Sequence, residues 1–346
     1  AFVGMIRRLD NAVDDVLQTL IDLGIEDNTL VVFTSDNGPH DEFNNPRSFN
    51  SFADMDGIKR DMWEAGIRVP TIAWWPTKIP SNSSTNFPSG TWDWMTTFAD
   101  LAIMAPPAKS DGVSLVDELF SPGSSTREGN LYFEYKYNQF PAFTPSYSQF
   151  QPSRRGQLRN QMQAIRIGDY KGVRTNVNTH NENFEIYNVV EDKKETTNLA
   201  ASMMDLQQLM KDEVLRMRIP TATAIRPYDN VEVPSLQVTD SLEQGLSYSF
   251  YNKSFKWVPD FNQIVADEIG KIGDIDLNIR QSNTEFGLYY HGFLDVPIAG
   301  VYTFYLETDA SAHVKIHKIH VLNDDFNATH IEQSTTLTLE SGLHPI

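Results

Sequence analysis

The chain has 346 residues, of which 40% are hydrophobic and 21% are charged, which is sufficient for two domains with buried cores. Its formal net charge of -18 argues against a protein that binds the phosphate backbone of nucleic acids, because such binding depends on Lys and Arg. The absence of cysteine excludes disulfides, thiolate catalysis and thiolate zinc sites within the chain.

The first predicted elements are an amphipathic helix and a buried strand. Apolar residues at helical spacing predict a helix over residues 5–23, and Gly24 ends it. The continuous apolar run Leu30–Phe33 predicts a parallel strand that is covered on both faces. A helix, a short turn and a buried strand in this order are typical of α/β proteins.

Polar residues follow this strand without a spacer, in the segment "TSDNGPH". Ligands of open parallel sheets bind beyond the carboxyl ends of the strands, where loops converge. We therefore expect Asp36, Asn37 and His40 to lie at a functional site. Taken alone, "DNG" is equally typical of an Asx turn that Gly38 ends.

The middle of the chain mixes helices and strands. The patterns predict, in order, a strand in "RVPTIAWWP", a helix from about Asp93, a short strand followed by a long aromatic surface excursion up to Gly156, a hairpin around Gly168 and Asp169, a strand in "FEIYNV", and a helix in "MMDLQQLMKDEVLRM". This is an α+β unit that follows an α/β core.

The domain boundaries follow from changes in composition. We predict an α/β core over residues 1–125, an α+β subdomain over 126–218, a proline-rich linker over 219–241 and a β-sandwich over 242–346. No apolar window is long enough to span a bilayer, so we expect a soluble protein.

Two motifs resemble the formylglycine-dependent sulfatases of the alkaline-phosphatase superfamily. They are "NTLVVFTSDNGPH" and "GIKRDMWEAGIRVPTIAWWP", and "DGVSL", "QAIRIGDYKGVR" and "FEIYNVVEDKKETTNLA" follow in the order of that family's carboxyl-terminal portion. The resemblance covers residues 1–218. It implies the C-terminal part of an alkaline-phosphatase-like sulfatase fold.

The resemblance assigns roles to individual residues. It makes Asp36 and Asn37 ligands of one divalent cation, Ca2+, which prefers hard oxygen ligands. It makes Lys59 the lysine that contacts the sulfate and stabilises its negative charge, with Arg60 in support. His40 then donates to the sulfate or acts as an acid, or else it caps the turn. Arg68 is expected to pair with a carboxylate.

The chain departs from the family pattern near this lysine. Met55-Asp56-Gly57 replaces the common Leu-Arg-Gly, and Glu64-Ala65-Gly66 replaces Glu-Gly-Gly. Asp56 is expected to add a negative charge near the proposed anion site.

The resemblance places the nucleophile upstream of this chain. The formylglycine arises from Cys or Ser in a C/S-x-P-x-R motif, and this sequence has none. The sequence opens with Ala1 and not with Met, and its first residues do not have the charged-then-apolar pattern of a leader. We expect a fragment of a longer protein that is inactive by itself.

The final segment resembles a PA14 module, truncated at its end, over residues 242–346. Thr308-Asp309-Ala310-Ser311 replaces the common Ser-Asp-Asp-Gly, so glycan binding there stays open. Two other groups have alternative explanations. Arg154, Arg155 and Arg159 either hold sulfated sugars or are solvated arginines beside a packed aromatic lid. The segment "HVKIHKIH" is a zinc site or, more simply, a set of surface histidines.

These observations lead to one main hypothesis and two rivals. The main hypothesis is an extracellular or periplasmic sulfatase that acts on sulfated glycans and does not bind nucleic acid. One rival is a phosphoester or phosphonate hydrolase of the same superfamily. The other is a non-catalytic glycan-binding protein on a decayed sulfatase scaffold. The sequence does not indicate the oligomeric state.

Overall fold

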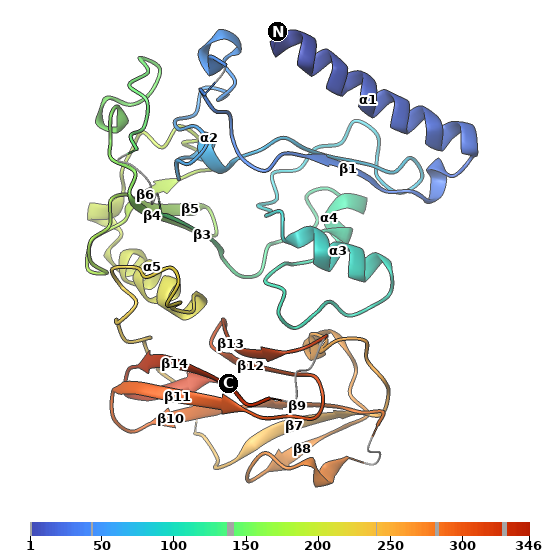
Figure 1. Cartoon of the computed structure of the whole chain (residues 1–346), viewed down its shortest axis with the longest axis vertical. Helices are drawn as coiled ribbons and strands as arrows, with labels where there is room; N and C mark the ends of the chain where they lie inside the picture. Colours follow the sequence, from blue (N-terminus) through green and yellow to red (C-terminus); the bar gives the residue numbers. More distant parts are fainter. Residues whose placement is uncertain (1, 43, 137–141, 240, 281–283, 327–330) are drawn as a thin grey trace. The chain divides into compact units, whose positions relative to one another are not determined.

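The computed structural model describes residues 2–42, 44–136, 142–239, 241–280, 284–326 and 331–346 (Figure 1). The chain forms two compact units. The first unit contains Ala1–Asp93, Val113–Val177 and Asn183–Met204. The second unit contains Trp94–Gly112, Asn178–Glu182 and Asp205–Ile346.

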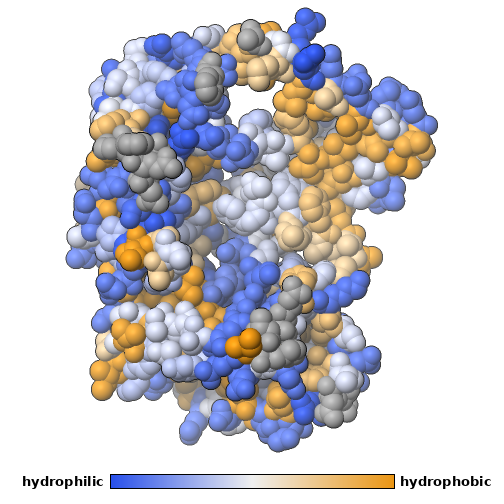
Figure 2. Space-filling view, in the orientation of Figure 1, coloured by the Kyte–Doolittle hydropathy of each residue, from blue (hydrophilic) through white to orange (hydrophobic). Residues whose placement is uncertain are grey.

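The first unit begins with helix α1 (Phe2–Leu23), and this confirms the predicted helix. Gly24 follows it with φ +65°, a left-handed conformation that glycine adopts without steric cost. No residue of α1 is buried, and apolar side chains such as Val16 and Leu23 are more than half exposed. Figure 2 shows apolar side chains gathered on this helix.

The pairing and burial of strand β1 (Val31–Thr34) differ from the expectation. β1 pairs antiparallel with β2 (Thr71–Trp74), and its apolar residues are only half-buried. Within the described residues no parallel neighbour covers it. The expectation of a parallel strand covered on both faces is therefore wrong. The polar residues that follow β1 are therefore positioned by contacts other than those of a parallel sheet.

A four-stranded antiparallel sheet provides the core of the first unit. Its order is β3 (Leu131–Lys136), β4 (Gln161–Ile167), β5 (Tyr170–Arg174) and β6 (Glu185–Asn188). The two-residue turn between β4 and β5 has Gly168 at φ +57°, as the predicted hairpin requires. Met62 and Trp63 pack into the core of this sheet.

The helices that follow α1 in the first unit are short. The unit contains α2 (Glu64–Ile67), α4 (Val116–Phe120), and the 3-10 helices at Glu26–Asn28, Pro46–Phe49, Pro152–Arg154 and Ala200–Ser202. Helix α3 (Asp93–Leu101) begins at the predicted Asp93, and the boundary between the units lies within it.

The aromatic segment after β3 is not a simple surface excursion. Phe150 is 1% exposed and packs against Phe52, with ring centroids 5.3 Å apart. Arg154 is also buried. Residues 137–141, which belong to the same predicted excursion, lie outside the described residues. The segment is therefore partly a core element, because one of its aromatic residues, Phe150, is buried against the first part of the chain.

The second unit contains helix α5 (Met204–Met217) and an all-β region. The strands are β7 (Leu246–Tyr251), β8 (Glu268–Ile272), β9 (Gly287–His291), β10 (Phe293–Val296), β11 (Gly300–Leu306), β12 (Ala312–Ile316), β13 (Ile319–Asp324), β14 (Gln333–Leu339) and β15 (Gly342–Pro345). They pair as β8-β7-β9, β10-β15, β11-β14 and β12-β13. Ile316, Ile319 and Leu339 are central residues of its core.

The three histidines of "HVKIHKIH" belong to two separate pairs, and the second pair includes His344 from the end of the chain. His313 contacts His320, with 2.9 Å between Nε2 and Nδ1, and His317 contacts His344 at 2.8 Å. Burial lowers the pKa of His313 to about 4. No group of three or more metal-ligating side chains occurs in the described part of the chain. The zinc site considered for these residues is not supported.

None of the described helices is both long enough and apolar enough to cross a membrane.

Candidate functional site

The polar corner after β1 lies against the loop that carries Lys59. The Gly38 amide donates to the Gly66 carbonyl at 3.0 Å, and the Lys59 amide donates to the Pro39 carbonyl at 2.7 Å. These main-chain bonds join the segment 35–41 (the corner) to the segment 57–66 (the lysine loop). The structure thus brings the backbone of Lys59 beside the residues expected at the site.

Gly38 permits this close approach because it has no side chain. A Cβ atom at position 38 would lie 1.7 Å from the carbonyl oxygen of Ala65. That oxygen belongs to the main chain, so no rotamer change can relieve the overlap. The corner and the lysine loop can be in contact only with glycine at this position.

We expect Gly38→Ala to lower the free energy of unfolding by about 2 kcal/mol or more, because the overlap forces the two segments apart. Gly4→Ala is the matched control, since a Cβ at position 4 meets nothing within 4 Å. In a helix that substitution is expected to stabilise by up to about 1 kcal/mol. Urea denaturation of both variants measures the difference, and equal unfolding midpoints would contradict this packing.

Asp36 and Asn37 present oxygen atoms that suit a hard cation. Asp36 is exposed, and its hydrogen bond from the Ser35 hydroxyl is long, at 3.5 Å. The Asn37 amide nitrogen donates to the Gly38 carbonyl at 2.8 Å, which leaves its Oδ1 atom as an acceptor. One carboxylate and one amide oxygen fit part of a calcium site, which needs six to eight oxygen ligands. The remaining ligands would have to come from elsewhere.

His40, Lys59 and Arg60 lie around one carboxylate, Glu42. Arg60 forms an ion pair with Glu42 at 2.6 Å, and the Glu42 amide donates to His40 Nδ1 at 3.2 Å. The hydrogen bond and charge of Arg60 lower the pKa of Glu42, and the charges of His40 and Lys59 lower it further. With Nδ1 as acceptor, neutral His40 carries its proton on Nε2.

Glu42 was not identified from the sequence. Its partner Arg60 is eighteen residues away along the chain, and no spacing rule connects the two. The only available signal was a carboxylate two residues after His40. The Glu42 side chain is 43% exposed and the Arg60 side chain is 32% exposed. The Glu42 carboxylate offsets one of the positive charges in this cluster.

Asp61 fixes the backbone next to Lys59. It accepts hydrogen bonds from the Ile58 amide at 2.9 Å and the Thr144 hydroxyl at 2.7 Å. Arg159 adds two more, at 2.8 and 3.1 Å. A forked arginine–carboxylate pair has a defined geometry. The lysine loop is therefore held on both sides of Lys59, by Ile58 and by Asp61.

Asp56 is a second buried anchor of this loop. It is fully buried and accepts from the Gln151 amide at 2.7 Å and from Arg154 at 2.9 Å. Burial raises the pKa of Asp56, although the Arg154 charge opposes the change. The expectation that Asp56 adds a negative charge at the proposed anion site is corrected, because this carboxyl group faces the interior.

Lys171 joins the lysine loop to the sheet. Its ammonium contacts Glu64 at 2.8 Å and Glu195 at 3.1 Å, and all three side chains are at least 92% buried. Burial alone would raise the pKa of both carboxyl groups, and the pKa of Glu195 is raised. The pKa of Glu64 is lowered overall, because the charge and the hydrogen bond of Lys171 outweigh the effect of burial. Arg68 also contacts Glu64, at 3.2 Å, and this confirms its expected carboxylate partner.

The arginines after the aromatic segment have structural partners. Arg154 lies over the Trp63 ring at 3.8 Å and donates to the Glu195 carbonyl, and Arg159 is bound to Asp61. Arg155 donates to the carbonyls of Phe150 and Ser148. These contacts favour the packed lid over a sugar-sulfate site for this group. The expectation that the arginines beside the lid are solvated is wrong for Arg154 and Arg159, which are buried.

Comparison with known families assigns most of the chain. Residues 1–104 match the family model described as Sulfatase. Residues 55–219 match the model described as N-sulphoglucosamine sulphohydrolase, C-terminal. Residues 242–346 match the PA14 domain.

Curated relatives match about a third of the chain. An N-acetylgalactosamine-6-sulfatase from Canis lupus familiaris is 38% identical over 130 residues, which cover 37% of this chain and 24% of that protein. A steryl-sulfatase from Rattus norvegicus is 39% identical over 105 residues, which cover 30% of this chain and 18% of that protein. The chain thus spans about a quarter of the length of the first of these relatives.

Solved structures resemble the chain more distantly. One is described as a complex with its substrate D-glucosamine-2-N,6-O-disulfate, with a TM-score of 0.44 and 23% identity, and covers 61% of this chain and 39% of that chain. Another is the phosphonate monoester hydrolase of Agrobacterium radiobacter, with a TM-score of 0.39 and 19% identity over 61% of this chain and 39% of that chain. Likeness at this level does not distinguish one ester chemistry from another.

Proposed function

We propose that this chain carries part of the active site of a sulfuric ester hydrolase acting on sulfated carbohydrates. The matches of residues 1–104 to the Sulfatase model, of residues 55–219 to the N-sulphoglucosamine sulphohydrolase C-terminal model and of residues 242–346 to the PA14 domain support this proposal. The observation that supports it most is the main-chain bond from Lys59 to Pro39, which puts the lysine loop against the corner. A site for sulfate needs positive groups near the metal ligands, and this contact supplies them.

Each residue of the site has a proposed role. Asp36 and Asn37 supply oxygen ligands for Ca2+, which when bound would stabilise negative charge on the sulfate. Lys59 binds a sulfate oxygen through its ammonium group. His40 donates from Nε2 to the substrate, since Nδ1 is engaged by the Glu42 amide. Arg60, paired with Glu42, adds positive charge at the edge of the site.

The nucleophile is proposed to come from sequence upstream of this chain, as a formylglycine. The residues described above bind and orient the sulfate and do not supply the attacking atom. We also propose an extracellular or periplasmic location, which the family membership supports. Detection of the protein in the medium or the periplasmic fraction checks that location.

The direct test is sulfate release by the full-length gene product. The name of the relative from Canis lupus familiaris suggests N-acetylgalactosamine 6-sulfate as the first substrate, followed by sulfated oligosaccharides. We expect chelation with EDTA to reduce the rate at least tenfold and Ca2+ to restore it, because two proposed ligands are hard oxygens. Ion chromatography measures the released sulfate.

Two outcomes of the same assay would contradict this function. Hydrolysis of phosphate or phosphonate monoesters without sulfate release would favour the related hydrolase chemistry. Glycan binding with no hydrolysis of any ester would favour a non-catalytic protein. The Asp36→Asn variant is a useful companion, because it keeps the size of the side chain and removes the charge that a cation needs.

A further inference from the structure

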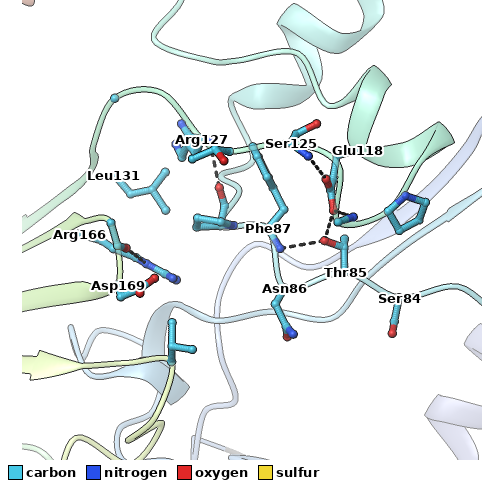
Figure 3. A pocket seen from close by; sticks show the side chains of 17 residues that line it. Ser84, Thr85, Asn86, Phe87, Glu118, Ser125, Arg127, Leu131, Arg166 and Asp169 are labelled. Carbon is cyan, nitrogen blue, oxygen red and sulfur yellow. Dashed lines mark hydrogen bonds between the residues drawn. The ribbon is translucent and has the colours of Figure 1, made fainter.

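A cavity lies in the first unit, and no residue of the corner or the lysine loop lines it. It has a volume of about 450 Å³, within the usual range for small-molecule sites, and it is partly open to solvent; Figure 3 shows the side chains that line it. Its walls come from residues 84–88, from the segment between α4 and β3, and from the turn between β4 and β5. None of the proposed site residues lines it.

Arg166 offers unused hydrogen-bond donors to this cavity. Its Nε atom donates to the Gly168 carbonyl at 2.9 Å, which holds the side chain at the β4–β5 turn. Its two terminal nitrogens have no hydrogen-bond partner within the described residues. Burial lowers the pKa of Arg166, because the partly buried guanidinium is less well solvated than it would be in water.

Arg127 also lines the cavity, and its own partners hold it in place. Its terminal nitrogens donate to Asp93 at 2.7 and 3.1 Å, and the side chain is 5% exposed. Its Nε atom is buried and has no hydrogen-bond partner among the residues that the structure describes. Because that atom is not accessible from the cavity, Arg127 forms part of the wall, and the donors available to a ligand are those of Arg166.

The other lining residues restrict what the cavity can hold. Glu118 accepts from the amides of Gly123 and Ser125, at 2.7 and 3.1 Å, and from the Thr85 hydroxyl, so its carboxylate is committed to its own loop. Phe87, which is half-buried, and Leu131, which is buried, supply an apolar wall. Figure 3 shows Phe87 between the Arg127 side and the Glu118 side of the cavity.

We propose that this cavity binds a sugar residue that carries one anionic group, with Arg166 contacting the anion and Phe87 packing against the ring. A guanidinium with two free donors suits a carboxylate or a sulfate, and an aromatic face beside it suits a sugar ring. The net charge of -18 makes a local arginine necessary for any anionic ligand. The choice of a sugar rests on the proposed function, because the ligand would be an outlying residue of the same glycan.

Asp169 sets a limit on the ligand charge. It lines the same cavity, and its charge acts on Arg166. Two anionic groups on one sugar would therefore meet repulsion from this carboxylate. Removal of the Asp169 charge should strengthen binding of an anion, whereas removal of the Arg166 charge should weaken it.

The experiment measures binding by calorimetry on the full-length gene product in a Lys59→Ala background, in which turnover is expected to be slow. The probes are glucuronic acid, galactose 6-sulfate, neutral galactose and inorganic sulfate. We expect both acidic sugars to bind roughly tenfold more tightly than galactose, and Arg166→Gln to remove that preference. Asp169→Asn should raise their affinity a few-fold, and the relative affinities of the two acids identify the preferred group.

Arg8→Gln is the matched control for Arg166→Gln, because Arg8 is exposed on α1 and its substitution makes the same change in net charge. Equal binding of acidic and neutral sugars would overturn the proposal, and so would unchanged affinities in both Arg166→Gln and Asp169→Asn. Binding by inorganic sulfate alone would also overturn it. Failure of sulfate release with intact sugar binding would reject the proposed function and leave this site supported.

Discussion

Replacement of Lys171 by methionine is expected to lower the free energy of unfolding by about 3–5 kcal/mol at pH 7. The Lys171 ammonium is 2% exposed and is shared by Glu64 and Glu195, which are 8% and 0% exposed. Methionine fills the same space but leaves the buried Glu195 carboxyl group without its ammonium partner, and it leaves Glu64 with Arg68 alone. An unpaired buried charge is among the most destabilising changes known in proteins.

The pH dependence of this loss has a defined sign. Glu64 has a lowered pKa in the folded protein, against a usual value of 4.5, so its contribution is present at neutral pH and is lost as the pH falls through the folded value. Glu195 has a raised pKa, chiefly from burial, so its contribution is complete at low pH and is lost as the pH rises through the folded value. Without Lys171 both carboxyl groups are more stable when protonated.

The Lys171→Met loss should therefore shrink as the pH falls from 7 toward about 4, because both carboxyl groups then enter the folded state neutral. Urea denaturation across this range measures it. Lys78→Met is the control, since Lys78 is exposed and should change the free energy of unfolding by less than about 0.5 kcal/mol. A loss that is the same at both ends of the range would contradict the shared-cation arrangement.

Lys59→Ala is expected to reduce kcat/KM for sulfate release by about 10²–10³-fold, the usual effect of losing one group that stabilises developing charge. Its backbone is held by the Pro39 carbonyl, and Asp61 secures the amide of the preceding Ile58. The side chain itself is only half-buried, so stability should change little. Steady-state kinetics together with thermal unfolding separate the two effects.

Lys59→Arg is the informative companion variant. It keeps the positive charge but replaces a compact ammonium by a longer planar group, so we expect partial activity. Lys78→Ala provides the control for a loss of one positive charge on the surface. If Lys59→Ala and Lys78→Ala release sulfate at the same rate, the proposed role of Lys59 is wrong.

Local patterns predicted the local elements. The helix that ends at Gly24 and the hairpin at Gly168 both appear, because helical apolar spacing and a glycine with positive φ depend on neighbouring residues alone. The mixed α/β class of the first part and the all-β region at the end were likewise predictable. Each depends on the period of apolar residues within a short segment.

Contacts between distant segments were not predictable in this way. The partner of β1 is β2, forty residues later, and no pattern in "LVVF" distinguishes an antiparallel neighbour from a parallel one. Similarly, Arg154 and Arg159 follow an aromatic segment and have the composition of a sugar site. Their carboxylate partners, Asp56 and Asp61, are each 98 residues away and determine that they are buried.

The sequence motifs identified the main residues of the candidate site but not the contacts between them. Asp36, Asn37 and Lys59 were identified from their sequence context, and the structure adds the backbone bonds that join the corner to the lysine loop. Their chemical roles remain predictions. Glu42 was missed because its importance depends on Arg60 and Lys59 being near in space.

A double-mutant cycle tests most directly whether the corner and the lysine loop form one site. It compares kcat/KM for sulfate release in Asp36→Ala, Lys59→Ala and the double variant of the full-length gene product. If both side chains act on one bound sulfate, the loss of kcat/KM in the double variant should be little larger than the loss in the less active of the two single variants. Losses that simply multiply would show two independent positions and would contradict the single site.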